Sequence, residues 1–240
     1  WSWKSRSGCR GESKRWHRLG CQIVIAMDWK FEMKFDVTQF SDNYLGEDPN
    51  QVAARARGVE LGTVDTTPGS GAFLRYIASL ISAQSVVEIG TGSGVGTLWL
   101  LNGIMQSGVI TTIDPEVQHI QIARQVLQDA DVAPNRYRLI TSDYLEVMHK
   151  LADRAYDLVV FRGNPEDILD VIDQSHRILR VGGILAIDHF YGGGKVPDPA
   201  QRDPKTVALR EAGKFLKSQS EVWDISLNPI GDGVLLATKL

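Results

Sequence analysis

Apolar residues recur along this chain with two alternating periods, one typical of helices and one typical of strands. Helical spacing predicts helices at residues 51–59, 71–81, 97–105, 116–129, 168–179 and 206–217. Short apolar runs predict strands at residues 86–89, 109–113, 137–141, 158–161, 184–188, 223–227 and 234–239. Strands and helices that alternate in this way predict a doubly wound α/β fold, in which mostly parallel strands carry helices on both faces.

The last two predicted strands follow each other without a helix between them. They are joined through a Gly-Asp-Gly turn at residues 231–233, which predicts a C-terminal hairpin that adds one antiparallel strand to a seven-stranded sheet. Ligands of such sheets bind beyond the carboxyl ends of the parallel strands. The positions where chemistry is expected are therefore residues 88–96, 114, 142–144, 162–166 and 188–194.

The composition is that of an ordinary globular protein, with 240 residues of which 43% are hydrophobic and 23% charged. This length suits one domain or at most two. No apolar run approaches the roughly 18 to 20 residues that a membrane-spanning helix requires, so we expect no membrane partner. The formal net charge of −3 gives the whole molecule no electrostatic reason to bind nucleic acid.

The first 26 residues differ in kind from the rest of the chain. They carry six basic residues and one acid, which leaves 20 basic and 28 acidic residues from Met27 onward. Both cysteines, Cys9 and Cys21, lie in this segment, so the remainder fits a reducing cytoplasm. We interpret residues 1–26 as a disordered basic arm or as residues upstream of the natural start, and residues 27–240 as a single domain.

A glycine-rich turn between a predicted strand and a predicted helix is the most informative segment. Glycines at positions 90, 92 and 94 allow a sharp turn and a close approach to a ligand, and a helix N-terminus follows. Asp114 ends the next strand, where a carboxylate can accept hydrogen bonds from both hydroxyls of a ribose. Asp114 also precedes Pro115 and suits a helix N-cap, and both roles can hold.

Glu88, directly before the glycines, separates two cofactor classes. A dinucleotide pyrophosphate favours amides alone at this position, whereas S-adenosylmethionine carries an ammonium and a sulfonium and no phosphate. A carboxylate at residue 88 therefore favours S-adenosylmethionine over NAD.

Six blocks of sequence resemble the catechol and caffeoyl-CoA type O-methyltransferase family, and specifically its small bacterial members. The blocks lie in this order at residues 65–74, 87–92, 110–114, 179–185, 193–198 and 229–233. The resemblance implies a Rossmann-like methyltransferase fold, a homodimer, and transfer of a methyl group to a hydroxyl of a small catechol-like or phenolic molecule. Carried over by position, the methionine and sulfonium part of the cofactor would be lined by Thr66, Glu88, Gly90, Thr91 and Gly96.

The same resemblance places Asp114 at the ribose and Asp143 and Tyr144 by the adenine, although a surface loop is an equal interpretation for the last two. The chain departs from the family where metal-dependent members carry an Asp-x-Asp-Lys pattern and an Asp-Asn pair. Here the first pattern reads Arg-Gly-Asn-Pro at residues 162–165, and the second reads Asp188-His189. A guanidinium in a ligand position would repel magnesium, and two remaining ligands are few, so we expect no metal site.

Without a metal, the hydroxyl needs another source of activation. Arg162 is a candidate partner for a phenolate or a substrate carboxylate, and His189 is a candidate general base that Asp188 would orient. A salt bridge from Arg162 to Glu166, Asp167 or Asp188 is an equal interpretation. Three rival functions follow: a cofactor-binding protein that has lost catalysis, a tRNA methyltransferase, and a hydride-transferring enzyme.

Overall fold

The computed structural model describes residues 37–240 of the chain. The predicted basic arm at residues 1–26 and the predicted domain start at Met27 lie outside the described residues. The compact unit that contains the described part runs from Phe35 to Leu240. Within residues 37–240, no helix has the length and apolar character needed to cross a membrane.

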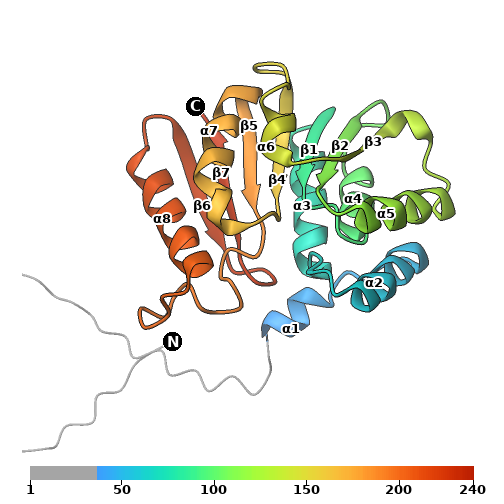
Figure 1. The fold of residues 1–240 in the computed structure, drawn as a ribbon, viewed down its shortest axis with the longest axis horizontal. Helices are drawn as coiled ribbons and strands as arrows, with labels where there is room; N and C mark the ends of the chain where they lie inside the picture. Colours follow the sequence, from blue (N-terminus) through green and yellow to red (C-terminus); the bar gives the residue numbers. More distant parts are fainter. Residues whose placement is uncertain (1–36) are drawn as a thin grey trace, which may run out of the picture. The chain divides into compact units, whose positions relative to one another are not determined.

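A seven-stranded sheet forms the centre of the described unit, in the order β3-β2-β1-β4-β5-β7-β6 (Figure 1). All neighbouring pairs among the first five strands are parallel, and β7 runs antiparallel to both β5 and β6. The predicted mixed sheet with an antiparallel C-terminal hairpin is therefore confirmed. The strands are β1 (Ser85–Ile89), β2 (Val109–Asp114), β3 (Tyr137–Thr141), β4 (Tyr156–Phe161), β5 (Leu179–Ile187), β6 (Trp223–Asn228) and β7 (Val234–Lys239).

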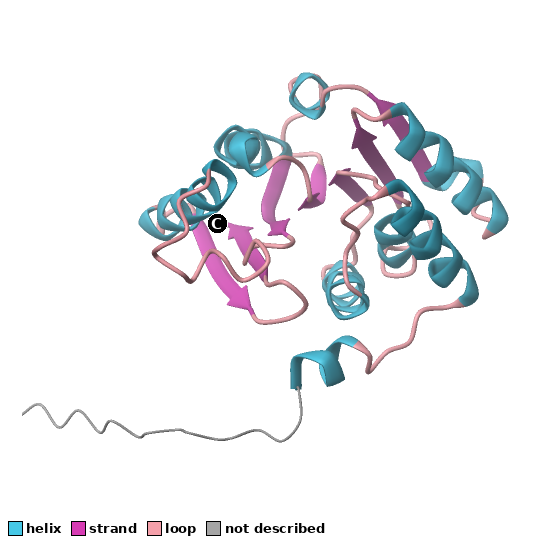
Figure 2. Cartoon of the chain, turned by 60° about the horizontal axis from the view of Figure 1, so that its bottom comes forward, coloured by secondary structure: helices cyan, strands magenta, loops and turns pink. Residues whose placement is uncertain are grey.

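Helices lie on both faces of this sheet (Figure 2). One face carries α6, α7 and α8, and the other carries α2, α3, α4 and α5. The α-helices are α1 (Val37–Asp42), α2 (Pro49–Leu61), α3 (Pro68–Leu80), α4 (Val95–Leu101), α5 (Val117–Asp129), α6 (Tyr144–Met148), α7 (Ile168–Ile178) and α8 (Pro204–Ser218). Two 3₁₀ turns, η1 (Pro134–Arg136) and η2 (Pro165–Asp167), precede β3 and α7.

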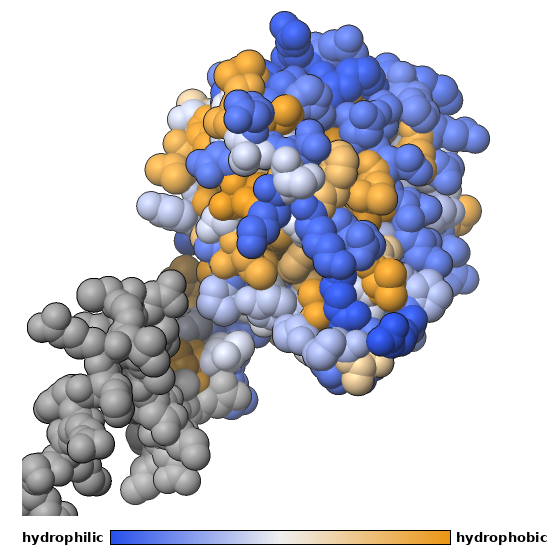
Figure 3. Space-filling model, turned by 90° about the vertical axis from the view of Figure 1, so that its left-hand side faces the viewer, coloured by the Kyte–Doolittle hydropathy of each residue, from blue (hydrophilic) through white to orange (hydrophobic). Residues whose placement is uncertain are grey.

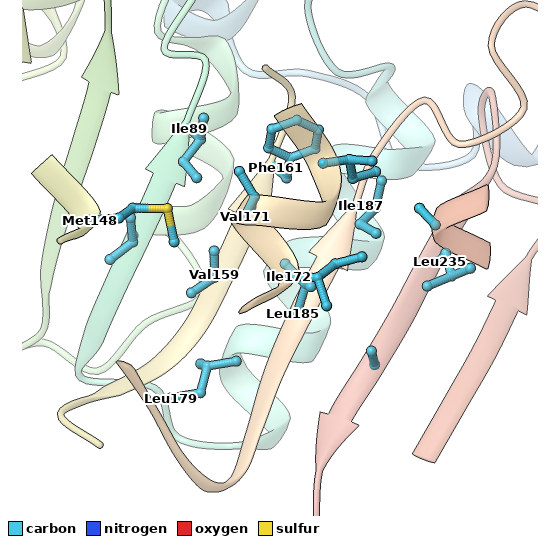
Figure 4. Close-up of a cluster of buried hydrophobic side chains, with 14 of the residues drawn as sticks. Ile89, Met148, Val159, Phe161, Val171, Ile172, Leu179, Leu185, Ile187 and Leu235 are labelled. Atoms are coloured by element: carbon cyan, nitrogen blue, oxygen red, sulfur yellow. The ribbon is translucent and has the colours of Figure 1, made fainter. Parts of the chain in front are cut away.

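The alternation of side chains along the central strands builds two hydrophobic cores. In β4, Val159 and Phe161 point to the face of α6, α7 and α8, whereas Leu158 and Val160 point to the opposite face. Figure 4 shows the first of these cores, in which Phe161 lies beside residues of β1, β5 and α7. Because both faces are covered, the central strands read as continuous apolar runs in the sequence.

Prolines and capping side chains move three helix starts earlier than the apolar pattern predicts, and one of them is that of α2, which begins at Pro49 after its N-cap Asp48. The structure begins α3 at Pro68 and α8 at Pro204, each at the first helical position, where the missing N–H of proline costs nothing. The preceding Thr67 and Asp203 accept hydrogen bonds from backbone N–H groups of the first turn. The apolar period marks only the buried side of a helix and therefore misses these polar first turns.

Two other boundaries differ because of tertiary contacts. The helix predicted at 97–105 spans Val95–Leu101, and the chain then leaves the helical hydrogen-bond pattern, because the backbone N–H of Met105 donates to the carbonyl oxygen of Ala83. The strand predicted at 184–188 begins at Leu179, which pairs with Tyr156 across a shift of register. The short helices α1 and α6 have too few residues for a periodic pattern and were not predicted.

Asp157 joins the beginnings of three strands. Its Oδ2 accepts hydrogen bonds from the backbone N–H of Gln84 (2.7 Å) and of Ser85 (2.8 Å), and its Oδ1 accepts one from Arg180 (2.5 Å). Burial by itself would raise the pKa of Asp157, but the Arg180 side chain and the two backbone donors outweigh it and hold that pKa below the ordinary value. The carboxylate form is therefore favoured by folding.

We expect Asp157→Asn to lower the free energy of unfolding by about 1–2 kcal/mol at neutral pH, because charge-assisted hydrogen bonds are lost. Since the pKa of Asp157 is lower in the folded than in the unfolded protein, this stabilisation is present at neutral pH and is lost as the pH falls through the folded value. Urea unfolding over a pH series measures the difference, with the exposed Asp170→Asn as the control. A difference that stays constant on acidification would contradict this account.

Candidate functional site

The glycine-rich turn after β1 forms the floor of the site. Gly90 has φ +86° and Gly94 has φ +87°, backbone conformations that glycine adopts without strain. A Cβ on Gly90 would lie 2.7 Å from the carbonyl oxygen of Arg162, which shows how closely the ends of β1 and β4 approach. Gly94 precedes α4, so a helix begins directly at the turn, as the sequence predicts.

Carboxylates of the chain already occupy two N–H groups of this turn. The backbone N–H of Gly92 donates to Oδ2 of Asp114 (3.1 Å), and the N–H of Ser93 donates to Oδ1 of Asp65 (3.1 Å). The hydroxyl of Thr63 donates a hydrogen bond to Oδ2, the second carboxylate oxygen of Asp65 (2.9 Å). A pyrophosphate would need these same donors and would meet two negative charges. The turn is therefore better suited to a cationic ligand than to a pyrophosphate.

Glu88 is fully buried at the end of β1 and forms an ion pair with Arg162. Thr97, in the first turns of α4, donates a hydrogen bond to the other oxygen of the carboxylate. Burial raises the pKa of Glu88, while the neighbouring guanidinium and the hydroxyl of Thr97 act in the opposite direction. Arg162 itself is 4% exposed, so the two charges neutralise each other inside the protein.

Arg162 lies between two carboxylates, because its second terminal nitrogen, Nη1, is 3.6 Å from Oδ2 of Asp188. Of the partners that the sequence suggested for Arg162, Asp188 is one, whereas the ion pair with Glu88 was missed. Glu88 precedes Arg162 by 74 positions, and only the pairing of β1 with β4 brings them together. The ion pair also means that the carboxylate of Glu88 is not a free partner for a cationic ligand.

A groove of about 590 Å³ opens beside the turn. Asp114, Asp143 and Tyr144 line it together with Gly90. Asp114 is 4% exposed and accepts hydrogen bonds from the backbone N–H of Glu116 (3.0 Å) as well as from Gly92. Asp114 thus lines the groove, but α5 begins at Val117 with Glu116 as its N-cap, so the N-cap role that the sequence suggested for Asp114 is wrong.

His119 also lines this groove, with its Nδ1 3.0 Å from Oδ1 of Asp114. His119 is not among the site residues that the sequence predicted. The spacing of five positions between Asp114 and His119 across the start of α5 was the available signal.

The adenine-side candidates are part of α6. Asp143 is the N-cap of this helix and accepts a hydrogen bond from the backbone N–H of Glu146 (3.1 Å). The hydroxyl of Tyr144 donates to Asp167, and burial together with this bond raises the pKa of Tyr144. Tyr144 is therefore a neutral hydroxyl that ties α6 to η2 at the wall of the groove.

The other candidates of the cofactor region differ in their surroundings. Thr66 is buried, and its Oγ1 has no hydrogen-bond partner among the described residues. Thr91 is paired through its hydroxyl with Thr112 (2.7 Å) in the neighbouring strand β2. A Cβ on Gly96 would collide with the guanidinium of Arg162, so glycine at position 96 makes room for that side chain.

A second, smaller cavity of about 260 Å³ adjoins the groove and shares Arg162, Gly163, Pro165 and Lys205 with it. Its other lining residues are Val64, Phe161, Asp188, His189 and Leu209.

Three residues of this smaller cavity carry buried polar atoms that have no hydrogen-bond partner within residues 37–240. They are Nη1 of Arg162, Oδ2 of Asp188 and Nε2 of His189. Nη1 of Arg162 and Oδ2 of Asp188 face each other as an ion pair at 3.6 Å, so among the described residues Nε2 of His189 is the atom of the three that has no counterpart. Buried polar groups are normally satisfied, so this nitrogen marks the cavity as a candidate binding place for a small polar molecule.

His189 has a backbone φ of +55°, which is uncommon for a residue with a side chain. Asp188 accepts a hydrogen bond from the backbone N–H of His189 (2.9 Å) through Oδ1. Asp188 therefore contacts the backbone N–H of His189, whereas the sequence suggested that it orients the ring. The ring nitrogen Nδ1 instead faces Asp232, at 3.9 Å from its Oδ2.

The charges around Arg162 bear on metal binding. Within residues 37–240, no group of three or more His, Cys, Asp or Glu side chains is arranged to hold a metal ion. The guanidinium of Arg162 fills the space between Glu88 and Asp188, the two carboxylates that would otherwise converge there. A divalent cation at this point would meet a buried positive charge.

The groove fits S-adenosylmethionine better than a phosphate-bearing cofactor. Asp114 lines the groove and, together with Asp65, occupies N–H groups of the adjoining turn that a phosphate would need. Ribose hydroxyls can donate to Asp114, which is the usual role of an acid at the end of the second strand.

Comparison with known proteins identifies the family. The sequence profile of a family described as O-methyltransferase matches residues 44–240. A protein of Mycobacteroides abscessus that carries the name of an O-methyltransferase is 41% identical over 199 residues, which cover 83% of this chain and 92% of the relative. A Corynebacterium glutamicum protein of known structure is 28% identical with a TM-score of 0.77, covering 84% of this chain and 94% of that one.

The fold is also that of the O-methyltransferase TomG from Streptomyces achromogenes, which was crystallised with S-adenosylmethionine. That structure has a TM-score of 0.74 at 24% identity and covers 84% of this chain and 94% of its own. The prediction of an S-adenosylmethionine-dependent methyltransferase is confirmed at the level of the family. The chain belongs to the O-methyltransferase family.

Proposed function

We propose that this protein transfers the methyl group of S-adenosylmethionine to a hydroxyl of a small catechol-like or phenolic molecule, without a divalent metal. The observation that carries the proposal is the cavity of about 260 Å³ beside the groove, which is lined by the Arg162–Asp188 ion pair and by His189, whose Nε2 has no hydrogen-bond partner among the described residues. Its remaining walls are largely apolar, which suits an aromatic ring. TomG, a protein of the same fold, binds S-adenosylmethionine, which supports this methyl donor.

In this proposal the groove holds the cofactor. Asp114 would bind the ribose, and Thr66, Gly90, Thr91 and Gly96 would lie along the methionine and sulfonium part. Asp143 and Tyr144 would lie by the adenine, and Glu88 would act through Arg162 rather than alone. The donor supplies an already activated methyl group, so the chain needs mainly to position the two reactants in line.

The smaller cavity would hold the acceptor. Nη1 of Arg162 is a donor that can stabilise a developing phenolate, and Nε2 of His189 can accept the hydroxyl proton. Asp188 would fix the loop that carries His189 by its contact with the backbone N–H. These roles follow the chemistry of the three side chains and replace the activation that a metal would give.

The experiment is a calorimetric titration of S-adenosylhomocysteine into protein that begins at Met27, followed by turnover with a panel of catechols. Each is done with magnesium and with EDTA. We expect micromolar binding and turnover that are both indifferent to magnesium. No binding under either condition would overturn the proposal, and binding that requires magnesium would overturn its metal-free part. Tight binding without turnover would favour a protein that has lost catalysis, and methyl incorporation into bulk tRNA would favour an RNA substrate.

The homodimer and the cytoplasmic location stay predictions. One surface relevant to assembly is the end of the sheet at β6, where Phe215 of α8 is 43% exposed and Leu227 is 48% exposed. Figure 3 views the molecule from this end and shows apolar side chains scattered among polar ones. Sedimentation velocity measures the oligomeric state directly.

A further inference from the structure

The Gly-Asp-Gly turn of the C-terminal hairpin contacts the loop that carries His189. The backbone N–H of Tyr191 donates to the carbonyl oxygen of Asp232 (2.8 Å), and the N–H of Phe190 donates to that of Gly233 (2.9 Å). The carboxylate of Asp232 accepts a hydrogen bond from the N–H of Gly193 (2.7 Å) through Oδ2. The turn therefore fixes the chain on the C-terminal side of His189 by three hydrogen bonds.

Both glycines of this turn are needed for it to pack against the neighbouring side chains. A Cβ on Gly233 would lie 2.7 Å from the ring of Tyr191, and one on Gly231 would collide with the hydroxyls of Thr67 and Ser70 at the start of α3. Both glycines also have positive φ, at +55° and +81°. The position of Asp232 is thus set by close packing on two sides and does not depend on a flexible loop.

This packing places the carboxylate of Asp232 beside Nδ1 of His189, a residue that lines the smaller cavity. Oδ2 of Asp232 is 3.9 Å from Nδ1, whereas Nε2 is buried, lacks a partner within the described part of the chain, and belongs to a residue that lines the acceptor cavity. The other charged residues of that cavity are Arg162, Asp188 and Lys205. None of these three side chains forms a hydrogen bond or an ion pair with the imidazole ring within residues 37–240.

We infer that Asp232 is a positioning residue for His189, which it holds with the proton on Nδ1 so that Nε2 faces the acceptor as a proton acceptor. A carboxylate beside Nδ1 favours the Nδ1–H form of a neutral imidazole and stabilises the imidazolium that forms when Nε2 takes a proton. This inference rests on the proposed function and adds a residue to its site.

The acceptor O–H bond breaks and its proton passes to Nε2 of His189, while the acceptor oxygen bonds to the donor's methyl carbon and the carbon–sulfur bond leaves its electron pair on sulfur. His189 then releases the proton to solvent. Asp232 takes no proton and acts through its charge and its place beside Nδ1.

The first test is the tautomer of His189, measured by nitrogen NMR of protein labelled at histidine, at a pH where the ring is neutral. His189→Gln identifies the signal. We expect the Nδ1–H form in the wild-type protein and a shift toward the Nε2–H form in Asp232→Asn, whose side-chain oxygen can still accept from Gly193. The control is Asp224→Asn on the same hairpin, an exposed residue that removes the same charge. The same tautomer in the wild type and in Asp232→Asn would overturn the inference.

The second test is the spectrum of bound 4-nitrocatechol, whose ionised form absorbs at longer wavelength than its neutral form. At a mildly acidic pH we expect the wild type and Asp224→Asn to bind the ionised form, and Asp232→Asn and His189→Gln to show at least about tenfold less of it. Equal ionisation in the wild type and Asp232→Asn would contradict the inference. Absence of any 4-nitrocatechol binding would count against the phenolic acceptor of the proposed function, while the tautomer measurement still decides the role of Asp232.

Discussion

Replacing Glu88 with glutamine is expected to lower the free energy of unfolding by about 3 kcal/mol. The substitution leaves Arg162 charged and 4% exposed, with Asp188 at 3.6 Å as its remaining acidic neighbour. Removing one partner of a buried ion pair typically costs about 3–5 kcal/mol, because the other charge stays out of water without compensation. Urea unfolding measures the loss, and Glu60→Gln on the exposed side of α2 is the matched control.

A second substitution separates the ion pair from a general packing defect. Adding Arg162→Met to Glu88→Gln removes the unpaired charge, so the double variant is expected to recover most of the lost stability. If the double variant is as unstable as Glu88→Gln alone, the loss comes from packing and our account of the pair is wrong.

Arg162→Met alone has a predictable dependence on pH. Burial raises the pKa of Glu88, and removal of the guanidinium takes away the main opposing influence. A carboxyl group whose pKa is higher in the folded than in the unfolded protein stabilises the fold at low pH, and that contribution is lost as the pH rises through the folded value. The destabilisation of Arg162→Met is therefore expected to be small in acid and to grow toward neutral pH.

Replacing Arg162 with aspartate is expected to make the protein depend on a divalent cation for stability. The change turns the cation between Glu88 and Asp188 into a third carboxylate, and without metal the three negative charges repel each other in a buried place. We expect a loss of about 4 kcal/mol without metal. Magnesium or manganese at millimolar concentration should restore part of it, because carboxylate oxygens are the ligands that these ions prefer.

Thermal unfolding with EDTA and with each metal measures this effect, and calorimetry of metal binding to the folded variant gives an independent value. Arg162→Met is the control, since it removes the guanidinium without adding a ligand, and neither it nor the wild type should gain stability from magnesium. If Arg162→Asp also gains none, the guanidinium is not what excludes the metal.

The pattern of the sequence predicts the sheet well and the helix ends less well. Most residues of β1, β2 and β4 are buried, and most are apolar, because helices cover both faces of the sheet, and this signal is strong in any α/β chain. The apolar pattern did not predict where α3 and α8 start, because prolines and polar capping residues determine these positions. The end of α4 was predicted too late, because the backbone N–H of Met105 pairs with Ala83 instead of continuing the helix.

Within the site, the sequence by itself determined the features that depend on residues close together along the chain. The glycine turn, the acid at position 114 and the residues after each parallel strand lie within a few positions of a strand end, and the topology of α/β sheets places strand ends together. The sequence also showed that Arg162 and His189 stand at two positions where the family resemblance places metal ligands, because this comparison requires only the residue types.

Only the tertiary structure decided which charges meet. Arg162 pairs with Glu88 because β1 and β4 are neighbours, and Asp232 reaches His189 because β7 lies against β5. Charged side chains have many partners of opposite sign at similar separations along a chain, and the sequence does not rank them. The packing of the sheet selects one partner for each, since a buried charge is tolerated only where its counter-charge is brought within contact distance.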